Sequence, residues 1–350
     1  MSGKFPDLMR SLQDSPDETP TSRMLAVLST LTPAEQGRFR EYWPNLSAET
    51  RRSSARTLVE MAEENVALDF THIFRMILKD ADEEVRLAAL DGLWEDEDEA
   101  LVPVLIRMMN ADPSVLVRAS TALVLGRFAL LGELEEISAE TTGALRRALM
   151  AVIDSPQEDL QVRRRAVEAV SFLSGEDVVQ VIEEAYRDKD ERMTVSAVFA
   201  MGHSLDERWA PFVYQELRNP RPEIRLEAAR AAGALELQDA VPILLDVVQD
   251  QDLEVREAAI EALGNIGGDR AIQVLLELVQ SQDETIRVAA LEALEVAQFN
   301  ETPLSPEVAT WLAAQQLAEG GWDTDLGDEE DWDDLDDEES DEDDGNGLGE

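Results

Sequence analysis

The chain contains no cysteine and only two histidines among its 350 residues. Without thiols it can form neither disulfide bonds nor thiolate metal sites. Its N-terminal segment lacks the apolar core of a secretory signal peptide, and we find no apolar run that approaches the roughly 20 residues of a membrane-spanning helix. We therefore expect a soluble, cytoplasmic protein.

Basic residues are also scarce. The chain has 30 Lys and Arg against 76 Asp and Glu, for a formal net charge of −46 at pH 7. Nucleic-acid binding depends on Lys and Arg side chains that displace counterions from phosphates, so we do not expect direct nucleic-acid binding. Anionic membranes are disfavoured for the same reason. The partner that this charge attracts is a protein with a basic surface.

The common catalytic motifs are missing as well. No serine nucleophile stands in a recognisable arrangement with a histidine, and no glycine-rich loop opens a helix as a phosphate cradle must. The acidic run at Glu95–Glu99 lacks the glycine and glutamate spacing of a calcium loop. We expect no catalytic, cofactor-binding or metal-ligating residues, and we favour a protein that is not an enzyme.

What the chain does contain is a repeat, with the pattern Val/Ile-Arg-x-x-Ala. Four of the six intervals between successive registers are 31 residues, and the longest, of 45 residues, is one interval plus an insertion. A fixed period of this size marks stacked supersecondary units. The register positions, with a threonine in one slot, are Arg86, Arg118, Arg163, Thr194, Arg225, Arg256 and Arg287.

The segment Asp239–Gly268 shows the repeated unit most clearly. Ile243, Leu244, Val247 and Val248 recur at three-and-four spacing, which places them on one face of a first helix. A second helix follows a short polar break and ends at a glycine-rich stop. Each unit is thus predicted to be a helical hairpin, and a hairpin of this kind buries both faces only against its neighbours.

Acidic residues or their substitutes occupy two positions before each register. They stand six residues before it (Asp80, Asp112, Gln157, Asp188, Asn219, Asp250, Ser281) and four residues before it (Asp82, Ser114, Asp159, Asp190, Arg221, Asp252, Asp283). We expect these turn residues to cap the second helix and to pair with arginines of the same or the adjacent unit. The predicted structural ladder is Asp80, Arg86, Asp112, Arg118, Arg163, Arg225, Asp250, Arg256 and Arg287.

The pattern D-x-D-x-x-V-R-x-A-A-x-x-A-L-G, read from Asp250 to Gly264, resembles the HEAT-like repeat named after phycobilisome (PBS) lyases. The resemblance covers residues 80–297 and is specific for repeat type, not for activity. It implies an all-α, armadillo-like fold: a right-handed α–α superhelix, or HEAT-like solenoid, of about seven to eight helical hairpins. It also implies a protein-binding role.

Three functions are compatible with such a repeat. Non-enzymatic scaffolds or adaptors, phycobilin lyases or their associated proteins, and iron-dependent hydroxylases of a modified lysine all carry it. The hydroxylase is excluded because neither His72 nor His203 begins a His-Glu pair. We favour the scaffold, while a lyase-like protein acting on phycobiliproteins and an acidic chaperone or mimic that binds a basic protein stay open as alternatives.

The chain divides into four parts by composition. We expect a flexible segment over residues 1–22, an irregular helical N-terminal cap over 23–79, and the repeat array with a C-terminal capping helix over 80–318. Residues 319–350 are predicted to be a disordered acidic tail, because 17 of the 30 residues from Gly321 to Glu350 are acidic and none is basic.

The concave side of a stacked hairpin array is lined by the second helices, so positions one and five past the register project there. Apolar residues mixed with charged ones at these positions suit a protein groove. The tail could add apolar anchors in an acidic setting. The candidate protein-binding residues are Leu87, Asp91, Arg164, Glu168, Val195, Phe199, Leu226, Arg230, Glu257, Glu261, Trp322 and Trp332.

Overall fold

The computed structural model describes residues 5–14 and 20–300, which contain helices and turns but no strand. The N-terminal elements are α1 (Phe5–Asp14), α2 (Ser22–Leu25), η1 (Ala26–Thr30), α3 (Pro33–Tyr42), η2 (Trp43–Asn45), α4 (Ala48–Glu64) and α5 (Thr71–Ile77). They are followed by α6 (Glu83–Gly92), η3 (Glu99–Leu101), α7 (Val102–Ala111), α8 (Val115–Glu133), α9 (Ala139–Ile153), α10 (Leu160–Val170), α11 (Glu176–Tyr186) and α12 (Glu191–His203). The last are η4 (Glu207–Trp209), α13 (Ala210–Glu216), α14 (Pro222–Ala234), η5 (Gln238–Ala240), α15 (Val241–Val247), α16 (Leu253–Ile266), α17 (Gly268–Leu278) and α18 (Glu284–Asn300).

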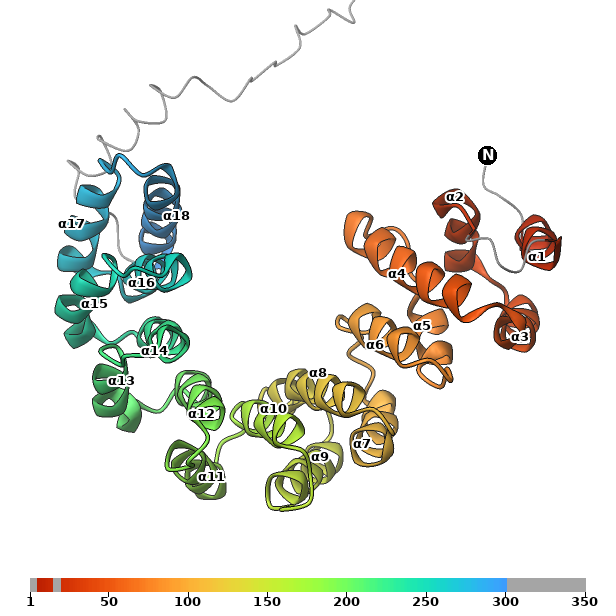
Figure 1. Ribbon diagram of the computed structural model, residues 1–350, viewed down its shortest axis with the longest axis horizontal. Coiled ribbons are helices and arrows are strands. Elements are labelled where there is room, and N and C mark those ends of the chain that lie inside the picture. The colour runs from red at the N-terminus through yellow and green to blue at the C-terminus, as the bar shows by residue number, and fades with distance from the viewer. Residues whose placement is uncertain (1–4, 15–19, 301–350) are drawn as a thin grey trace, which may run out of the picture. The chain divides into compact units, whose positions relative to one another are not determined.

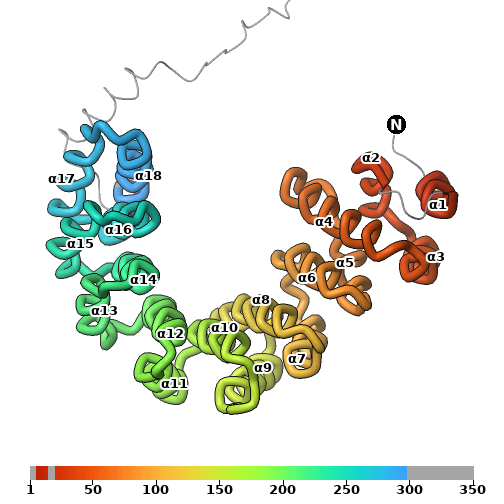
Figure 2. Tube along the Cα trace, viewed as in Figure 1, coloured from red at the N-terminus to blue at the C-terminus, as the bar shows by residue number. Residues whose placement is uncertain are grey.

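From α4 onward the helices alternate between two layers (Figures 1 and 2). The even-numbered helices from α4 to α18 form the inner layer of this curved array, and the odd-numbered helices form the outer layer. From α6 onward each even-numbered helix contacts both the odd-numbered helix before it and the even-numbered helices on either side. The fold is therefore the all-α helical solenoid that the repeat predicts, with the second helix of each hairpin on the inner side.

The hairpins meet through a continuous apolar interior. Leu93, Leu263 and Leu294, each seven positions past a register, are all fully buried at 0% exposure. In the unit around α15 and α16, Ile243 and Leu244 of the first helix are buried as well. The second helix of that unit ends at Gly267, whose φ of 61° is the left-handed conformation that favours glycine at a helix end.

The inner helices approach most closely where a glycine meets an alanine. A Cβ atom added at Gly233 would lie 2.9 Å from the Cα atom of Ala262, and one added at Gly264 would lie 2.7 Å from the carbonyl oxygen of Ala293. In each pair the glycine lies eight residues after the register position of its own unit, and the alanine lies six residues after the register position of the next unit. The same pairing recurs as Gly126 on Ala169 and Gly202 on Ala231. Small residues at these two positions set the spacing of the inner layer.

The N-terminal segment differs from the expectation of a flexible lead. Residues 5–14 form helix α1, in which Phe5, Leu8 and Leu12 are buried. These residues are three and four positions apart and so lie on one helical face. That face packs against α2 and η1, which explains why the abundance of Asp and Pro nearby does not keep residues 5–14 unfolded.

The insertion also takes an unexpected form. Gly132 and Gly143 predict that the insertion lengthens the connection over residues 132–143, but α8 continues to Glu133 and α9 begins at Ala139. By length and composition α8, a 19-residue helix, is apolar enough to cross a membrane, contrary to the expectation from the sequence that no segment would be. It is the one such helix within the described residues, and more than half of it is buried in the array. The helix is apolar over most of its length because it packs against four other helices, α6, α7, α9 and α10.

The predicted C-terminal capping helix and the acidic tail, with Trp322 and Trp332, lie outside the described residues.

Candidate protein-binding face

The turns that lead into the inner helices carry arginine–carboxylate rungs between successive units. Arg86 donates from Nε and Nη2 to the two carboxylate oxygens of Asp112, both at 2.8 Å, and from Nη1 to the backbone carbonyl of Asp80 at 2.8 Å. Arg225 binds Asp250 in the same way, at 2.6 and 2.7 Å. Each arginine thus joins the turn of its own unit to the turn of the next.

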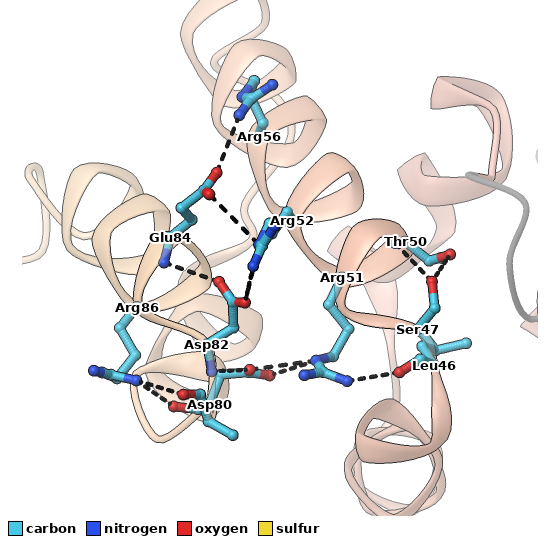
Figure 3. Close-up of polar contacts among 11 residues, drawn as sticks. Leu46, Ser47, Thr50, Arg51, Arg52, Arg56, Asp80, Asp82, Glu84 and Arg86 are labelled. Atoms are coloured by element: carbon cyan, nitrogen blue, oxygen red, sulfur yellow. Dashed lines mark hydrogen bonds and ion pairs between the residues drawn. The ribbon is translucent and has the colours of Figure 1, made fainter.

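The ladder begins one unit before the first regular register (Figure 3). Arg51 of α4 lies 3.1 Å from Asp80, and Arg52 donates to Asp82 at 2.6 Å. Asp82 also caps α6 by accepting from the backbone N–H of Glu84 at 3.0 Å. Because the hydrogen bond from Arg52 stabilises the charged form of Asp82, the pKa of this carboxyl group is lowered.

Other rungs deviate from this pairing, and at Gln157 and Ser281 the acidic position itself is substituted. Arg118 pairs with Glu158 at 2.8 Å, since Gln157 holds the usual acidic position. Arg163 donates to the carbonyl oxygen of Ile153 at 3.0 Å instead of reaching Asp188. Arg256 donates to the carbonyl of Asp250 at 3.1 Å, and Arg287 lies 3.4 Å from Glu284 of its own helix.

The buried rungs make these residues structural. The side chains of Arg86 and Asp112 are only 8% and 7% exposed. Removing one partner of such a pair leaves an unpaired charge in the interior, at a cost of roughly 3–5 kcal/mol. The ladder residues therefore hold successive units in register.

The inner face carries the predicted binding residues at different depths. Leu87, Val195 and Leu226 are half-buried, whereas Asp91 and Arg230 are exposed. Arg230 pairs with Glu227 at 3.1 Å. Asp91 lies in a shallow hollow with Glu63 and Trp94, where burial, and then the charge of Glu63, raise the pKa of Asp91.

A second hollow, of about 490 Å³, lies on the inner face between α8, α10 and α12. Its walls are mostly apolar. Two of the predicted binding residues, Glu168 and Phe199, line it, and they are joined by residues from α8 and from the ends of α6, α10 and α12. The lining comprises Trp94, Glu97, Leu123, Arg127, Leu130, Leu131, Glu168, Ala169, Phe172, Phe199 and His203. We name this feature the central hollow.

Aromatic rings fix one wall of the central hollow. Phe199 stacks on His203 with ring centroids 3.9 Å apart, and Phe172 meets His203 edge-on at 5.0 Å. The Nδ1 atom of His203 lies 3.0 Å from the carbonyl oxygen of Phe199. Burial lowers the pKa of His203, so the ring favours its neutral form. The wall is therefore apolar at neutral pH.

Polar contacts close the other side of the hollow. Glu168 is buried, contrary to the prediction of a projecting side chain, because it accepts hydrogen bonds from Ser196 at 2.6 Å and from Arg165 at 2.5 Å. Arg164 donates to the same Ser196 hydroxyl at 3.0 Å. Arg127 pairs with Glu97 at 2.7 Å at the mouth. Glu168 thus positions α10 against α12 and does not offer a free carboxylate.

The C-terminal end of the inner face holds Glu257 and Glu261. Both line a groove between α16 and α18 together with Val288 and Glu292. This acidic groove is separate from the central hollow in both its helices and its lining residues. The structure therefore does not join the predicted binding residues in one site. Glu168 and Phe199 line the central hollow, Glu257 and Glu261 line the acidic groove, and Asp91 lines the hollow beside Trp94. Among the predicted residues that the structure describes, those that line none of these three concavities are Leu87, Arg164, Val195, Leu226 and Arg230.

Comparison with known proteins identifies the repeat. The family described as HEAT repeats matches residues 71–151 and 210–295. These two ranges of the chain are HEAT repeats. It is 30% identical to a deoxyhypusine hydroxylase of Cryptococcus neoformans var. neoformans serotype D (strain B-3501A) over 122 residues, which amount to 33% of this chain and 33% of that relative. The match thus spans about a third of the relative's length.

Two solved structures are similar to this HEAT-repeat protein at low identity. The complex of CpcE and CpcF of phycocyanin lyase from Nostoc sp. PCC7120 is 18% identical, with a TM-score of 0.49 over 70% of this chain and 94% of that chain. A structure of Kap95p with RanGDP is 15% identical, with a TM-score of 0.49 over 90% of this chain and 48% of that chain.

Several residues of the central hollow were not among the predicted binding residues. Leu123 lies five positions past Arg118, so the rule that selected the others also selects it. Phe172 and His203 lie nine positions past their registers, in the last turn of the inner helix or just beyond it. A rule that stops at position five misses that end of each helix. Extending it to position nine would have found both rings.

Proposed function

We propose that this HEAT-repeat protein is a non-enzymatic scaffold or adaptor that holds a partner protein against its inner face, with the central hollow receiving an apolar anchor of the partner. The supporting observation is the convergence of exposed apolar residues on one concavity. Trp94, Leu123 and Leu130 are 42%, 36% and 41% exposed, and all three line the hollow. Contiguous exposed apolar surface of this kind is typical of interaction sites.

We further propose that the partner has a basic surface around its apolar anchor. Glu95 and Glu97, 84% and 60% exposed, stand beside Arg127 at the mouth of the hollow and outnumber it. The net charge of −46 adds a long-range attraction for a basic protein and speeds encounter more than it tightens the final complex. An apolar anchor with basic flanks fits this combination.

The acidic segment of residues 321–350, with Trp322 and Trp332, is proposed to modulate the same binding, because its charge attracts the same partners. Affinity capture with the full chain and with a version that ends at Gly320, at low and at raised salt, tests this part. Partners held by charge should leave as salt screens the attraction. Equal capture by both versions at every salt concentration would contradict a role for the segment.

Substitution of Phe199 by Asp tests the site itself. A carboxylate in the aromatic wall should weaken partner binding by about tenfold or more, because the anchor loses its apolar contact. The measurement is partner affinity, with helicity followed by circular dichroism. Leu123→Asp changes an exposed residue of the same hollow, and Gln180→Asp on the outer helix α11 adds the same charge elsewhere.

We expect Phe199→Asp and Leu123→Asp to lose binding and Gln180→Asp to keep it. A large loss of helicity in Phe199→Asp would show that Phe199 is core, in which case Leu123→Asp decides the question. Unchanged affinity in Leu123→Asp would contradict the proposal.

A further inference from the structure

The acidic groove between α16 and α18 has an apolar floor. Its volume is about 680 Å³, and α18 supplies the floor with Val288, Ala289, Ala293 and Val296. Val288 and Val296 are 45% and 41% exposed, so a large part of their apolar surface faces solvent. From Val288 to Val296 the floor extends about 12 Å along the helix axis. Three successive turns of α18 therefore present apolar atoms along one line.

Carboxylates flank this floor on both sides. Glu257 and Glu261 come from α16, and Glu284 and Glu292 come from α18. Only Glu284 forms an ion pair within residues 5–14 and 20–300, with Arg287 at 3.4 Å. The other three acids have no basic partner there, and the groove therefore carries unneutralised negative charge around an apolar strip.

We infer that this groove binds a basic amphipathic helix of a partner protein. Helix-in-groove recognition places the apolar face of such a helix, spaced at three and four residues, along an apolar groove. Lys or Arg residues beside that face would meet Glu257, Glu261 and Glu292. The inference rests on the proposed scaffold function of the inner face, and it gives the C-terminal end of that face its own occupant.

Charge selects between possible occupants. The chain's own segment from Gly321 to Glu350 has 17 acidic and no basic residues, so the groove would repel it. A second copy of this chain would bring the same excess negative charge. A basic helix gains from both the apolar strip and the carboxylates, and it is the occupant that these contacts favour.

The absence of cysteine makes the test specific. Thr285→Cys at the exposed rim of the groove, labelled with an environment-sensitive fluorophore in the full-length chain, reports on this site alone. The probe is a designed helical peptide of Leu and Lys, about 18 residues long, with all Leu on one face. The control peptide has the same composition in scrambled order, because a basic peptide also binds acidic segments without specificity.

The amphipathic peptide should shift the label's emission and saturate, with the scrambled peptide about tenfold weaker or more. Val288→Asp, and separately the double variant Glu257→Gln with Glu261→Gln, should each weaken the amphipathic peptide by a similar factor. A double variant of Glu254→Gln with Glu277→Gln changes the same charge at exposed positions outside the groove and should leave the affinity unchanged.

Equal binding of the two peptides, or an unchanged affinity in Val288→Asp, would overturn the inference. An emission that depends on protein concentration without peptide would also overturn it, because a second copy would then fill the groove. Phe199→Asp should not alter peptide binding at the groove. Failure at the central hollow and failure at the groove are therefore distinguishable.

Discussion

At the scale of single residues, the regular rungs follow one rule: Arg86 and Arg225 each bind the aspartate six positions before the next register. Arg163 is an exception, because it binds the carbonyl oxygen of Ile153 and does not reach Asp188. The rule explains substitutions that look unrelated in the sequence. Thr194 and Asn219 occupy the two positions of one rung. Because both side chains are uncharged, this rung leaves no charged side chain without a partner. Arg256 faces Ser281 instead of a carboxylate, and its Nε atom is buried without a hydrogen-bond partner among the described residues.

The unfilled rung at Arg256 can be completed by Ser281→Asp. The new carboxylate should accept from Arg256 as Asp250 does from Arg225, and it should still cap the N–H of Asp283, which Ser281 now accepts at 3.1 Å. We expect the free energy of unfolding, from urea denaturation, to rise by about 1 kcal/mol.

Asn219→Asp is the matched control for this gain. It places a carboxylate opposite Thr194 and beside Glu216, to which the Asn219 amide now donates at 2.5 Å. This variant should lose stability, since like charges meet without an arginine. A gain in both variants, or in neither, would contradict the rung rule.

His203 provides a pH test of the aromatic wall. Burial lowers its pKa from the ordinary value of 6.5, so between these two values the unfolded chain binds the proton and the folded chain does not. Stability from this residue is present above pH 6.5 and is lost as the pH falls toward the lowered pKa. NMR titration of the two histidines, assigned with His203→Gln, should give a value below 6.5 for His203. A value at or above 6.5 would contradict a buried, stacked ring.

At the scale of helices, the sequence predicts the hairpins well because each unit repeats the same local signals. The stop at Gly267 and the buried face of α15 follow directly from residue type and spacing. The insertion was misjudged because Gly132 and Gly143 suggested a loop. In the structure Gly132 lies inside α8, where Thr142 packs so closely that an added Cβ would meet its Oγ1 atom at 2.6 Å. A glycine selected for close packing and one selected for a turn look the same in a sequence.

The central hollow was the least predictable feature. It forms where the last turns of α8, α10 and α12 come together, and a single repeat does not show which of those ends will face one another. Phe199 was found because it holds a periodic position. Leu130, in the extension of α8, has no counterpart in the other units, so the repeat could not have indicated it.

The glycine–alanine contacts between inner helices predict a clear loss in Gly233→Ala. The added Cβ would lie 2.9 Å from the backbone of Ala262, so two inner helices must separate, at a cost of about 1–3 kcal/mol in the free energy of unfolding. Gly37→Ala in α3 is the control, since nothing lies within 4 Å of its added Cβ. That variant should gain about 0.5–1 kcal/mol from helix propensity. Equal effects at the two sites would contradict close packing as the reason for Gly233.

At the scale of the whole molecule, the contacts between units and the exposed concavities use different residues. Charged residues of the turns and of the register positions form the ladder rungs, while the inner layer leaves apolar residues and carboxylates exposed in two concavities. The full chain carries a formal net charge of −46. Division of this kind suits a scaffold, because the contacts that keep the units together are not the contacts offered to a partner.

The most direct measurement of this account is site-specific photo-crosslinking of the full-length chain in its cells of origin. A photoreactive amino acid at position 123 in the central hollow, and at position 180 on the outer helix α11, compares the two faces. We predict a discrete protein crosslinked from position 123 only, and its loss in Phe199→Asp. The same protein crosslinked equally from position 180, or retained in full by Phe199→Asp, would contradict binding at the inner face.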